Sequence, residues 1–257
     1  MKISIITIVY NRVHCIEDCI KSVLSQTYRD VEYIIIDGGS NDGTTEIIDN
    51  YKDKIDYYIS EKDEGIFDAL NKGIKNSTGD VIGILNSDDF FYSEDTLSHI
   101  IEAFQYSAAD LVYAKGLFVS ENDTSKIKRI YPSNPFNKVF LNFGWIPLHT
   151  TIFVKKEVFE NYGNYNPGYR IASDYEISLR WFKNDEITKF YLNEWVVKMR
   201  LGGLSTSAKL QLKKSKEDLS IILKYKLPGV FTLGFKIARK IPHYIIPQLF
   251  GERSITS

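Results

Sequence analysis

Short, almost uninterrupted runs of β-branched and other apolar residues are the feature that most restricts how this chain can fold. Three of them cover Ile3–Val9, Val31–Ile36 and Val81–Leu85, and a less apolar run covers Ile55–Ser60. Strands that are apolar along their whole length are buried on both faces, which is typical of a parallel sheet between two layers of helices. The runs therefore predict an α/β fold.

Segments with helical spacing separate these runs, as the spacing of Ile16, Ile20 and Val23 shows. Helices are expected at about 16–24, 45–51, 66–78, 97–104, 156–162 and from 173 onwards, and further strands at 110–113, 117–120, 150–154, 187–192 and 196–200. The resulting order, βαβαβαβαβ, predicts a doubly wound, Rossmann-like and mostly parallel sheet.

The Val81–Leu85 run leads directly into Asn86-Ser87-Asp88-Asp89, which places two carboxylates at the end of a buried strand. Adjacent carboxylates repel each other, and their burial is costly unless a cation or hydrogen-bond donors balance the charge. A hard cation such as Mg²⁺ or Mn²⁺ is the natural partner for these oxygen ligands. The alternative is a solvated turn in which Asp88 caps a helix.

A second polar turn follows the Val31–Ile36 run and spans Asp37–Thr44, with glycines at three positions. A strand, a glycine-rich turn and a helix in this order suit the binding of phosphate or ribose. An NAD-binding domain is disfavoured, because the first strand is followed by Tyr10-Asn11-Arg12-Val13-His14 and not by the glycine fingerprint of that class.

The length of 257 residues fits one large α/β domain, and the formal net charge of −1 argues against a nucleic-acid-binding protein. Cys15 and Cys19 are four residues apart on an expected helix and are interpreted as core thiols of a cytosolic protein. No apolar stretch reaches the ~18 residues of a membrane span. A cytoplasmic location is therefore expected, with peripheral contact to the inner face of the membrane as an open alternative.

The last fifty residues differ in character from the rest of the chain. Residues 205–257 contain ten Lys or Arg against three Asp or Glu, so this part carries +7 and residues 1–204 carry −8. A charged helix is expected around 210–225, and Pro228-Gly229 should end it. The basic and apolar segment 226–250 can lie in a membrane interface or pack against the body of the protein, and the sequence leaves both open.

Taken together, these motifs resemble family 2 glycosyltransferases of GT-A fold. The resemblance is carried by Tyr10-Asn11, the Asp37–Thr44 turn, Asp63–Gly73 and Leu85–Asp89 in this order. It covers about residues 1–205 and is closest to bacterial enzymes that build surface polysaccharides such as O-antigen or capsule. It implies a nucleotide-sugar half at about 1–115, an acceptor half at about 116–205 and a basic, amphipathic helical tail at 206–257.

The resemblance also implies roles for individual residues. Those expected to bind the nucleotide sugar are Thr7, Val9, Tyr10, Asn11, Asp37, Asn71, Lys72, Asn86, Ser87 and Asp88. Asp89 would coordinate the Mn²⁺ or Mg²⁺ that bridges the donor diphosphate. Gly38 departs from the family pattern, because many relatives carry there an acid that contacts uracil, so that Asp37 or backbone groups would have to substitute.

Asp174, in Ser173-Asp174-Tyr175-Glu176, matches the position of the family's catalytic base. A positioned carboxylate can take the proton of an acceptor hydroxyl, and direct displacement inverts the anomeric centre. The alternative for Asp174 is a plain helix cap. Weaker expectations are that His149 binds acceptor or phosphate, with a structural histidine as its alternative, and that Gly203 and Ser205 belong to a segment over the donor phosphates.

The predicted activity is inverting, metal-dependent transfer of a hexosyl or N-acetylhexosaminyl group from a nucleotide diphosphate sugar, most favourably a UDP-sugar. The acceptor would be a glycan or a lipid-diphosphate-linked molecule in bacterial surface polysaccharide biosynthesis. One alternative is a nucleotidyltransferase, which would need a glycine-rich, Lys- or Arg-containing loop where this chain has Tyr10-Asn11-Arg12. The other is a catalytically silent nucleotide-sugar-binding protein.

Overall fold

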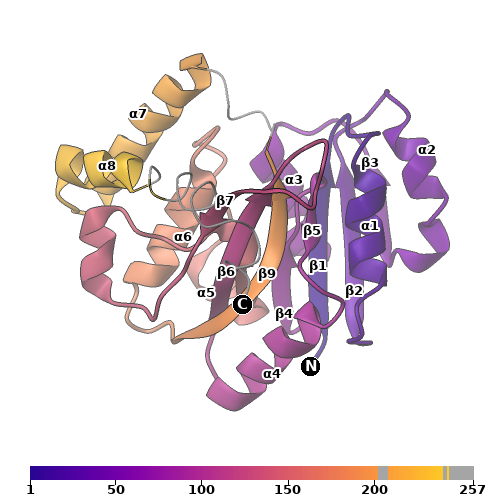
Figure 1. The fold of residues 1–257 in the computed structure, drawn as a ribbon, viewed down its shortest axis with the longest axis horizontal. Helices are drawn as coiled ribbons and strands as arrows, with labels where there is room; N and C mark the ends of the chain where they lie inside the picture. The colour runs from indigo at the N-terminus through magenta and orange to yellow at the C-terminus, as the bar shows by residue number, and fades with distance from the viewer. Residues whose placement is uncertain (202–207, 240–241, 243–257) are drawn as a thin grey trace.

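A computed structural model describes residues 1–201, 208–239 and 242 of the chain. In this part the backbone forms a single nine-stranded sheet with helices on both faces (Figure 1). The strands are β1 Ile3–Val9, β2 Val31–Asp37, β3 Tyr57–Ser60, β4 Val81–Ile84, β5 Asp89–Phe91, β6 Leu111–Val119, β7 Ile127–Tyr131, β8 Ile152–Lys155 and β9 Lys189–Arg200. The predicted α/β architecture is confirmed.

The helices follow the expected order along the chain. They are α1 Ile16–Leu24, α2 Thr44–Asp49, α3 Ile66–Asn76, α4 Thr96–Ser107, α5 Lys156–Tyr162, α6 Ser173–Lys183, α7 Ala208–Lys224 and α8 Gly229–Ala238, with short 3₁₀ helices η1 Lys52–Lys54, η2 Lys138–Phe143 and η3 His149–Thr151.

The strand order is β3-β2-β1-β4-β8-β6-β9-β5, with β7 paired to β6 outside this path. The first four strands along this order run parallel, as predicted. Strand β8 lies between β4 and β6 and is antiparallel to both. Strand β5 pairs antiparallel with β9, and β7 pairs antiparallel with β6, whereas β6 and β9 are parallel to each other. Strands β1 to β4, the first four along the chain, therefore form an all-parallel half of the sheet.

Two hydrophobic cores cover the two faces of the sheet, because successive side chains of a strand point to opposite faces. Ile3 and Ile5 of β1 belong to one core, together with residues of α1, α2 and α4. Ile6 and Ile8 belong to the other, together with residues of α3, α5, α6 and α7. This division explains why the strands are apolar along their whole length.

Four details of the sheet differ from the sequence prediction. The strands expected at 110–113 and 117–120 form one strand, β6, and those expected at 187–192 and 196–200 form one strand, β9. The pairing of β6 with β9 shifts register on both sides of Lys115, whose ammonium lies over the Trp195 ring. Such an irregularity interrupts the apolar pattern without ending the strand. Strands β5 and β7 were not predicted, because β5 has only three residues and β7 carries the charged residues Lys128 and Arg129 among its five.

The described part of the tail packs against the body of the protein (Figure 1). Ile221 and Ile222 of α7 are fully buried in the same core as α6. Thr232 of α8 donates a hydrogen bond to the carbonyl of Asn142, 2.8 Å away. Among the described helices none has the length and apolar character needed to cross a bilayer.

Glu32 joins three segments of the parallel half of the sheet. The carboxylate, buried on β2, accepts hydrogen bonds from Ser4 Oγ at 2.5 Å and from the backbone N–H of Thr78 at 2.7 Å, and it pairs with Lys2 Nζ at 2.8 Å. Burial alone would raise the pKa of Glu32, but these donors outweigh it and lower the pKa to about 2.

Replacing Glu32 by Gln should lower the free energy of unfolding at neutral pH by about 2–3 kcal/mol, because the donors around it lose an ionised acceptor. A carboxyl group whose pKa is lower in the folded protein than in the unfolded chain stabilises the fold at pH values above the pKa of the unfolded chain. The difference between wild type and variant should therefore shrink as the pH falls from 4.5 towards about 2 in urea titrations. Glu160→Gln, at an exposed position, is the matched control, and equal losses in both variants would contradict the prediction.

Candidate active site at the carboxyl ends of the parallel strands

The parallel strands end at one edge of the sheet, where most of the predicted site residues lie. Val9 at the end of β1 is in register with Asp37 at the end of β2, and Asp37 is in register with Ser60 at the end of β3. Strand β4, which leads to Asp88 and Asp89, is the other neighbour of β1. Ligands of open α/β sheets bind at this edge.

Asp37 is fully buried and its carboxylate is occupied by the turn that follows it. Its oxygens accept hydrogen bonds from the backbone N–H groups of Gly39 and Ser40 and from the hydroxyls of Ser40 and Ser60. With these four donors in place, Asp37 holds the turn and the end of β3 together. These hydrogen bonds give Asp37 a structural role, and its part in nucleotide binding stays a prediction.

Asp63 is a site residue that the sequence analysis did not single out. A Cβ atom at Gly38 would lie 3.1 Å from Asp63 Oδ2 and 3.4 Å from the ring of Tyr10, so the carboxylate fills the space beside the glycine. The Tyr10 side chain is 59% exposed and forms the open wall of this space. The available signal was the position of Asp63, three residues after the end of the third parallel strand.

Lys72 and Asn71, both on α3, are engaged within the protein. Lys72 Nζ lies 2.6 Å from Asp63, 2.7 Å from Glu61 and 3.3 Å from Asp68, and these hydrogen bonds raise its pKa. The amide of Asn71 donates to the carbonyl of Tyr165 and accepts from its backbone N–H. Lys72 thus fixes Asp63, and Asn71 fixes the loop around Tyr165.

Several other residues predicted for the nucleotide pocket are buried or hydrogen-bonded within the protein. Thr7, Val9 and Ser87 are buried. Thr7 Oγ1 accepts a hydrogen bond from Tyr33 OH at 3.2 Å, inside the core. Asn11 has a left-handed backbone with φ of 52°, and its side-chain oxygen accepts from the backbone N–H of Asn41 at 3.0 Å. Asn11 therefore joins the end of β1 to the Asp37–Thr44 turn.

Asp89 is fully buried at the first position of β5, where it is in register with Met199 of β9. Asn86 Nδ2 donates to its Oδ2 at 2.9 Å, whereas its Oδ1 has no hydrogen-bond partner among the described residues. Burial, and then the neighbouring charge of Asp88, raises the pKa of Asp89 well above its usual range. A buried carboxylate oxygen with no donor is costly, and a bound cation would remove that cost.

The donor set around Asp89 fits a divalent cation that is also held by substrate. The described residues contain no group of three or more His, Cys, Asp or Glu side chains that could hold a metal unaided. Mg²⁺ in particular is commonly bound by one or two carboxylates together with substrate phosphates. Asp89 Oδ1 supplies such an oxygen, and the half-buried Asp88 stands beside it.

Arg200, at the end of β9, is a second residue that the sequence analysis missed. Its guanidinium donates to the backbone carbonyl of Asp88 at 3.2 Å, pairs with Asp18 of α1 and lies over the Phe90 ring. These contacts hold the Asp88-Asp89 turn between α1 and β9. The residue could not be found from the sequence, because it lies 112 positions after Asp88.

Asp174 and His149 lie close together in the structure. Asp174 is in the first turn of α6, and its Oδ2 is 3.7 Å from His149 Nδ1. The helix begins after Ala172 with no side-chain cap, so Asp174 is not a helix cap. Burial raises the pKa of Asp174, but Lys214, then His149 and Lys236, outweigh it, so that the pKa lies below its usual value.

His149 links the two acidic groups of the site. Burial lowers its pKa, while the charges of Asp174 and, more weakly, Asp88 act in the opposite direction. Both carboxylates are therefore near the same imidazole.

Gly203 and Ser205 lie outside the described residues. Trp145 and Trp181 are buried in the core.

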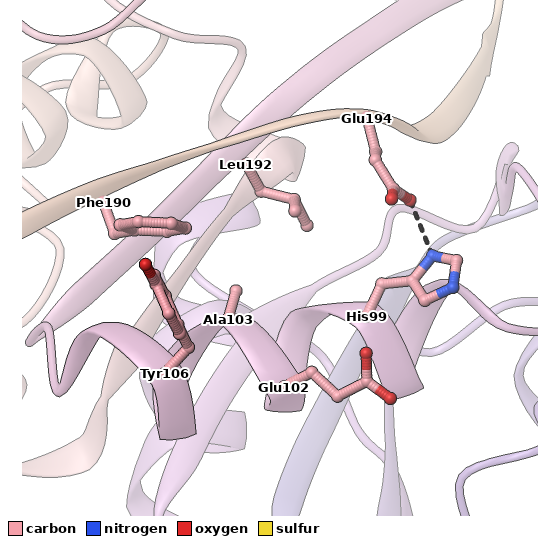
Figure 2. Close-up of a pocket in the computed structure, with 7 residues that line it drawn as sticks. All are labelled: His99, Glu102, Ala103, Tyr106, Phe190, Leu192 and Glu194. Atoms are coloured by element: carbon pink, nitrogen blue, oxygen red, sulfur yellow. Dashed lines mark hydrogen bonds and ion pairs between the residues drawn. The ribbon is translucent and has the colours of Figure 1, made fainter.

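A shallow hollow elsewhere on the surface has a different character. It lies between α4 and β9 and is lined by His99, Glu102, Ala103, Tyr106, Phe190, Leu192 and Glu194 (Figure 2). His99 Nδ1 is 2.6 Å from Glu194 Oε2, so these two polar groups satisfy each other. It contains none of the predicted site residues.

Comparison with known proteins identifies the group to which these features belong. Residues 4–163 match the family described as glycosyl transferase family 2. A PGL/p-HBAD biosynthesis glycosyltransferase of Mycobacterium tuberculosis (strain H37Rv) is 29% identical over 194 residues, which cover 74% of this chain and 73% of the relative. An uncharacterized glycosyltransferase of Rickettsia prowazekii (strain Madrid E) is 28% identical over 225 residues, 84% of this chain and 70% of the relative.

Solved structures confirm the GT-A fold. S. aureus TarS 1–349 superposes with a TM-score of 0.69 at 16% identity, over 99% of this chain and 76% of TarS 1–349, and the complex of TarS with UDP-GlcNAc gives the same score. A mannosyltransferase from Pyrobaculum calidifontis, solved with GDP-Man and Mn²⁺, gives 0.66 at 14% identity over 98% of this chain and 76% of that protein.

Replacing Asp89 by Asn should stabilise the metal-free protein at neutral pH by about 1–2 kcal/mol, because the variant no longer buries a carboxylate beside Asp88. A carboxyl group whose pKa is raised by folding destabilises the fold increasingly as the pH rises above 3.8, the usual pKa of the group. The gain in stability of the variant should therefore vanish as the pH falls towards 3.8. Chemical unfolding in chelator at several pH values measures it.

The same variant should lose the rise in melting temperature that Mn²⁺ with UDP gives the wild type, since binding stabilises only the protein that binds. Asp53→Asn, at an exposed position, should change the free energy of unfolding by less than about 0.5 kcal/mol and keep the response to Mn²⁺. An Asp89→Asn variant less stable than wild type at neutral pH would contradict the interpretation of Asp89 as an unbalanced buried acid.

Proposed function

Because the chain belongs to glycosyl transferase family 2, we propose that it transfers a sugar from a nucleotide diphosphate sugar to a hydroxyl acceptor with inversion at the anomeric carbon. The observation that carries this proposal is the buried Oδ1 of Asp89, which has no hydrogen-bond partner among the described residues, together with the pair formed by Asp174 and His149. One end of the site thus suits a cation and a diphosphate, and the other suits proton transfer.

The donor is proposed to lie along the ends of β1, β2 and β4. Its base would stack on the exposed ring of Tyr10, with Asp63 as the carboxylate beside it, since Asp37 is occupied and position 38 has no side chain. Asp88 and Asp89 would hold Mn²⁺ or Mg²⁺ against the diphosphate. When bound, that cation supplies Lewis-acid stabilisation of the charge on the leaving group.

Asp174 is proposed as the general base. Its depressed pKa keeps it ionised at neutral pH, so the carboxylate can receive the acceptor's proton. The hydroxyl oxygen forms its bond to the anomeric carbon as the bond to the diphosphate breaks on the opposite face, and the proton passes to Asp174. His149, 3.7 Å away, orients the carboxylate or contacts the departing phosphate.

The relatives support a sugar nucleotide as the donor. TarS was solved with UDP and with UDP-GlcNAc, and the Pyrobaculum enzyme with GDP-Man and Mn²⁺. We propose a UDP-linked hexose or N-acetylhexosamine as donor and a glycan or lipid-diphosphate-linked acceptor in bacterial surface polysaccharide biosynthesis. A silent binding protein would bind UDP without turnover of any donor, and a nucleotidyltransferase would release diphosphate from a nucleoside triphosphate.

Asp174→Asn should reduce kcat for transfer at least about 10²-fold, because a positioned general base contributes roughly 10²–10⁴-fold. The Kd for the donor, measured calorimetrically with Mn²⁺, should stay within about twofold, because the lost group serves the acceptor hydroxyl. Asp185→Asn, an exposed acid near the end of α6, is the control. Full transfer activity in the Asp174→Asn variant would exclude Asp174 as the base.

An aromatic patch on the tail supports contact with a membrane that carries the acceptor. Phe143 of η2 and Phe231 and Phe235 of α8 form the patch, with ring centroids 4.6–5.9 Å apart. Their side chains are 41%, 51% and 43% exposed, and Val230 beside them is 74% exposed. Exposed aromatic residues on a basic segment are typical of helices that lie at a bilayer surface.

Replacing both Phe231 and Phe235 by Ser should weaken binding to vesicles that contain anionic lipid by at least about tenfold, because two rings no longer enter the interface. Vesicle sedimentation at low and high salt measures this, and high salt should weaken the wild type as well. Tyr106→Ser removes an aromatic residue that is 86% exposed on α4 and serves as the control. Equal binding by all three proteins would contradict a membrane role for the patch.

A further inference from the structure

Helix α7 of the tail is fixed directly beside the candidate base by a carboxylate. Glu217 accepts hydrogen bonds from three successive backbone N–H groups, those of Arg170 at 3.2 Å and of Ile171 and Ala172 at 2.9 Å. These residues form the strap that enters α6 immediately before Ser173. The strap and α7 therefore keep one relative position, and Asp174 is two residues from it.

Lys214 lies three residues before Glu217, so both side chains are on the same side of α7. Its Nζ is 4.0 Å from Asp174 Oδ1, and its side chain is only 20% exposed. His149 approaches the other carboxylate oxygen, Oδ2, from η3 at 3.7 Å. The acid is thus held between a residue of the body and a residue of the tail.

The groups near Asp174 differ in how much charge they carry. Burial lowers the pKa of His149, which leaves it largely neutral at neutral pH. Lys236 of α8 is buried, lies 2.7 Å from Asp218 and over the Tyr175 ring, and burial lowers its pKa to about 7. Lys214 keeps its charge, because Asp174 raises its pKa.

The other described groups near the acid do not supply a permanent positive charge. Tyr165, in the loop before α6, has its ring buried in the core, and its phenol is neutral because burial raises its pKa. Asp88, whose charge also acts on His149, is an acid itself. Among the described residues, the permanent cation beside Asp174 therefore comes from α7.

We propose that Lys214 is a positioning residue that pairs with Asp174 and keeps it ionised, so that the tail completes the active site of the proposed transferase. The inference rests on the proposed role of Asp174 as base. A nucleotide diphosphate bound near Asp88 brings further negative charge towards the carboxylate, which favours its protonation. The positive charge of Lys214 offsets that field. The tail then has a catalytic task that is independent of any membrane.

The test compares Lys214→Met with Lys214→Arg and with Lys216→Met, which removes the same charge from an exposed position of α7. The first measurement is a pH titration of the Asp174 carboxyl by NMR in full-length protein labelled with ¹³C-aspartate, with Asp174→Asn to assign the signal. We expect the pKa of Asp174 to rise in the Lys214→Met variant, to be unchanged in the Lys216→Met variant and to stay close to wild type in the Lys214→Arg variant.

The second measurement is the pH profile of transfer. In the Lys214→Met enzyme the acidic limb of kcat/KM should move to higher pH, with a loss of about tenfold at acidic pH that disappears at alkaline pH. A merely structural lysine would lower the rate equally at every pH. Circular dichroism and thermal unfolding show whether each variant is folded.

The outcomes separate this inference from the proposed function. An Asp174 pKa that does not change in the Lys214→Met protein overturns the inference, whether or not transfer is observed. A raised pKa together with an unmoved acidic limb supports the pairing but overturns Asp174 as the base. A wild type that turns over no nucleotide sugar overturns the proposed function, and the NMR titration still decides whether Lys214 pairs with Asp174.

Discussion

A carboxylate that is buried next to a second carboxylate raises the free energy of a folded protein, and the arrangement of this molecule depends on how that cost is met. Asp89 is held at the first position of β5 by pairing with β9, and Arg200 of β9 binds the turn just before it. The two strands that fix the acid are far apart in the sequence, at Asp89–Phe91 and Lys189–Arg200, and β4, which leads to it, pairs with the first strand of the chain. The site therefore forms only when both halves of the sheet are assembled.

Much of the fold follows from local patterns in the sequence. The apolar runs predicted β1, β2 and β4, because a strand between two helical layers needs apolar residues on both faces. The position of Asp88 and Asp89 at the end of such a run indicated a cation site, but it left a solvated turn as an equal alternative. The antiparallel strands β5 and β7 were not predictable in this way, since their few residues owe their extended form to the strands they pair with.

The roles of the polar residues were harder to predict, because they depend on which donors reach them. Asp37 appears in the sequence as one acid in a glycine-rich turn, yet four hydrogen bonds occupy it in the structure. The carboxylate of Asp63 occupies the space that a side chain at Gly38 would fill. The contact of Lys214 with Asp174 joins positions 40 residues apart on helices whose packing no local pattern encodes.

The pairing of Asn71 with Tyr165 joins the proposed donor half of the domain to the proposed acceptor half. Two hydrogen bonds connect the side-chain amide of Asn71, on α3, to the backbone carbonyl and N–H of Tyr165, in the loop before α6. The rings of Phe67 and Tyr165 stack with centroids 5.7 Å apart. Chimeras between relatives that exchange the acceptor half would separate these partners unless both are carried across the junction. Exchange of acceptor specificity by recombination is therefore restricted to donor halves that present the same amide and ring.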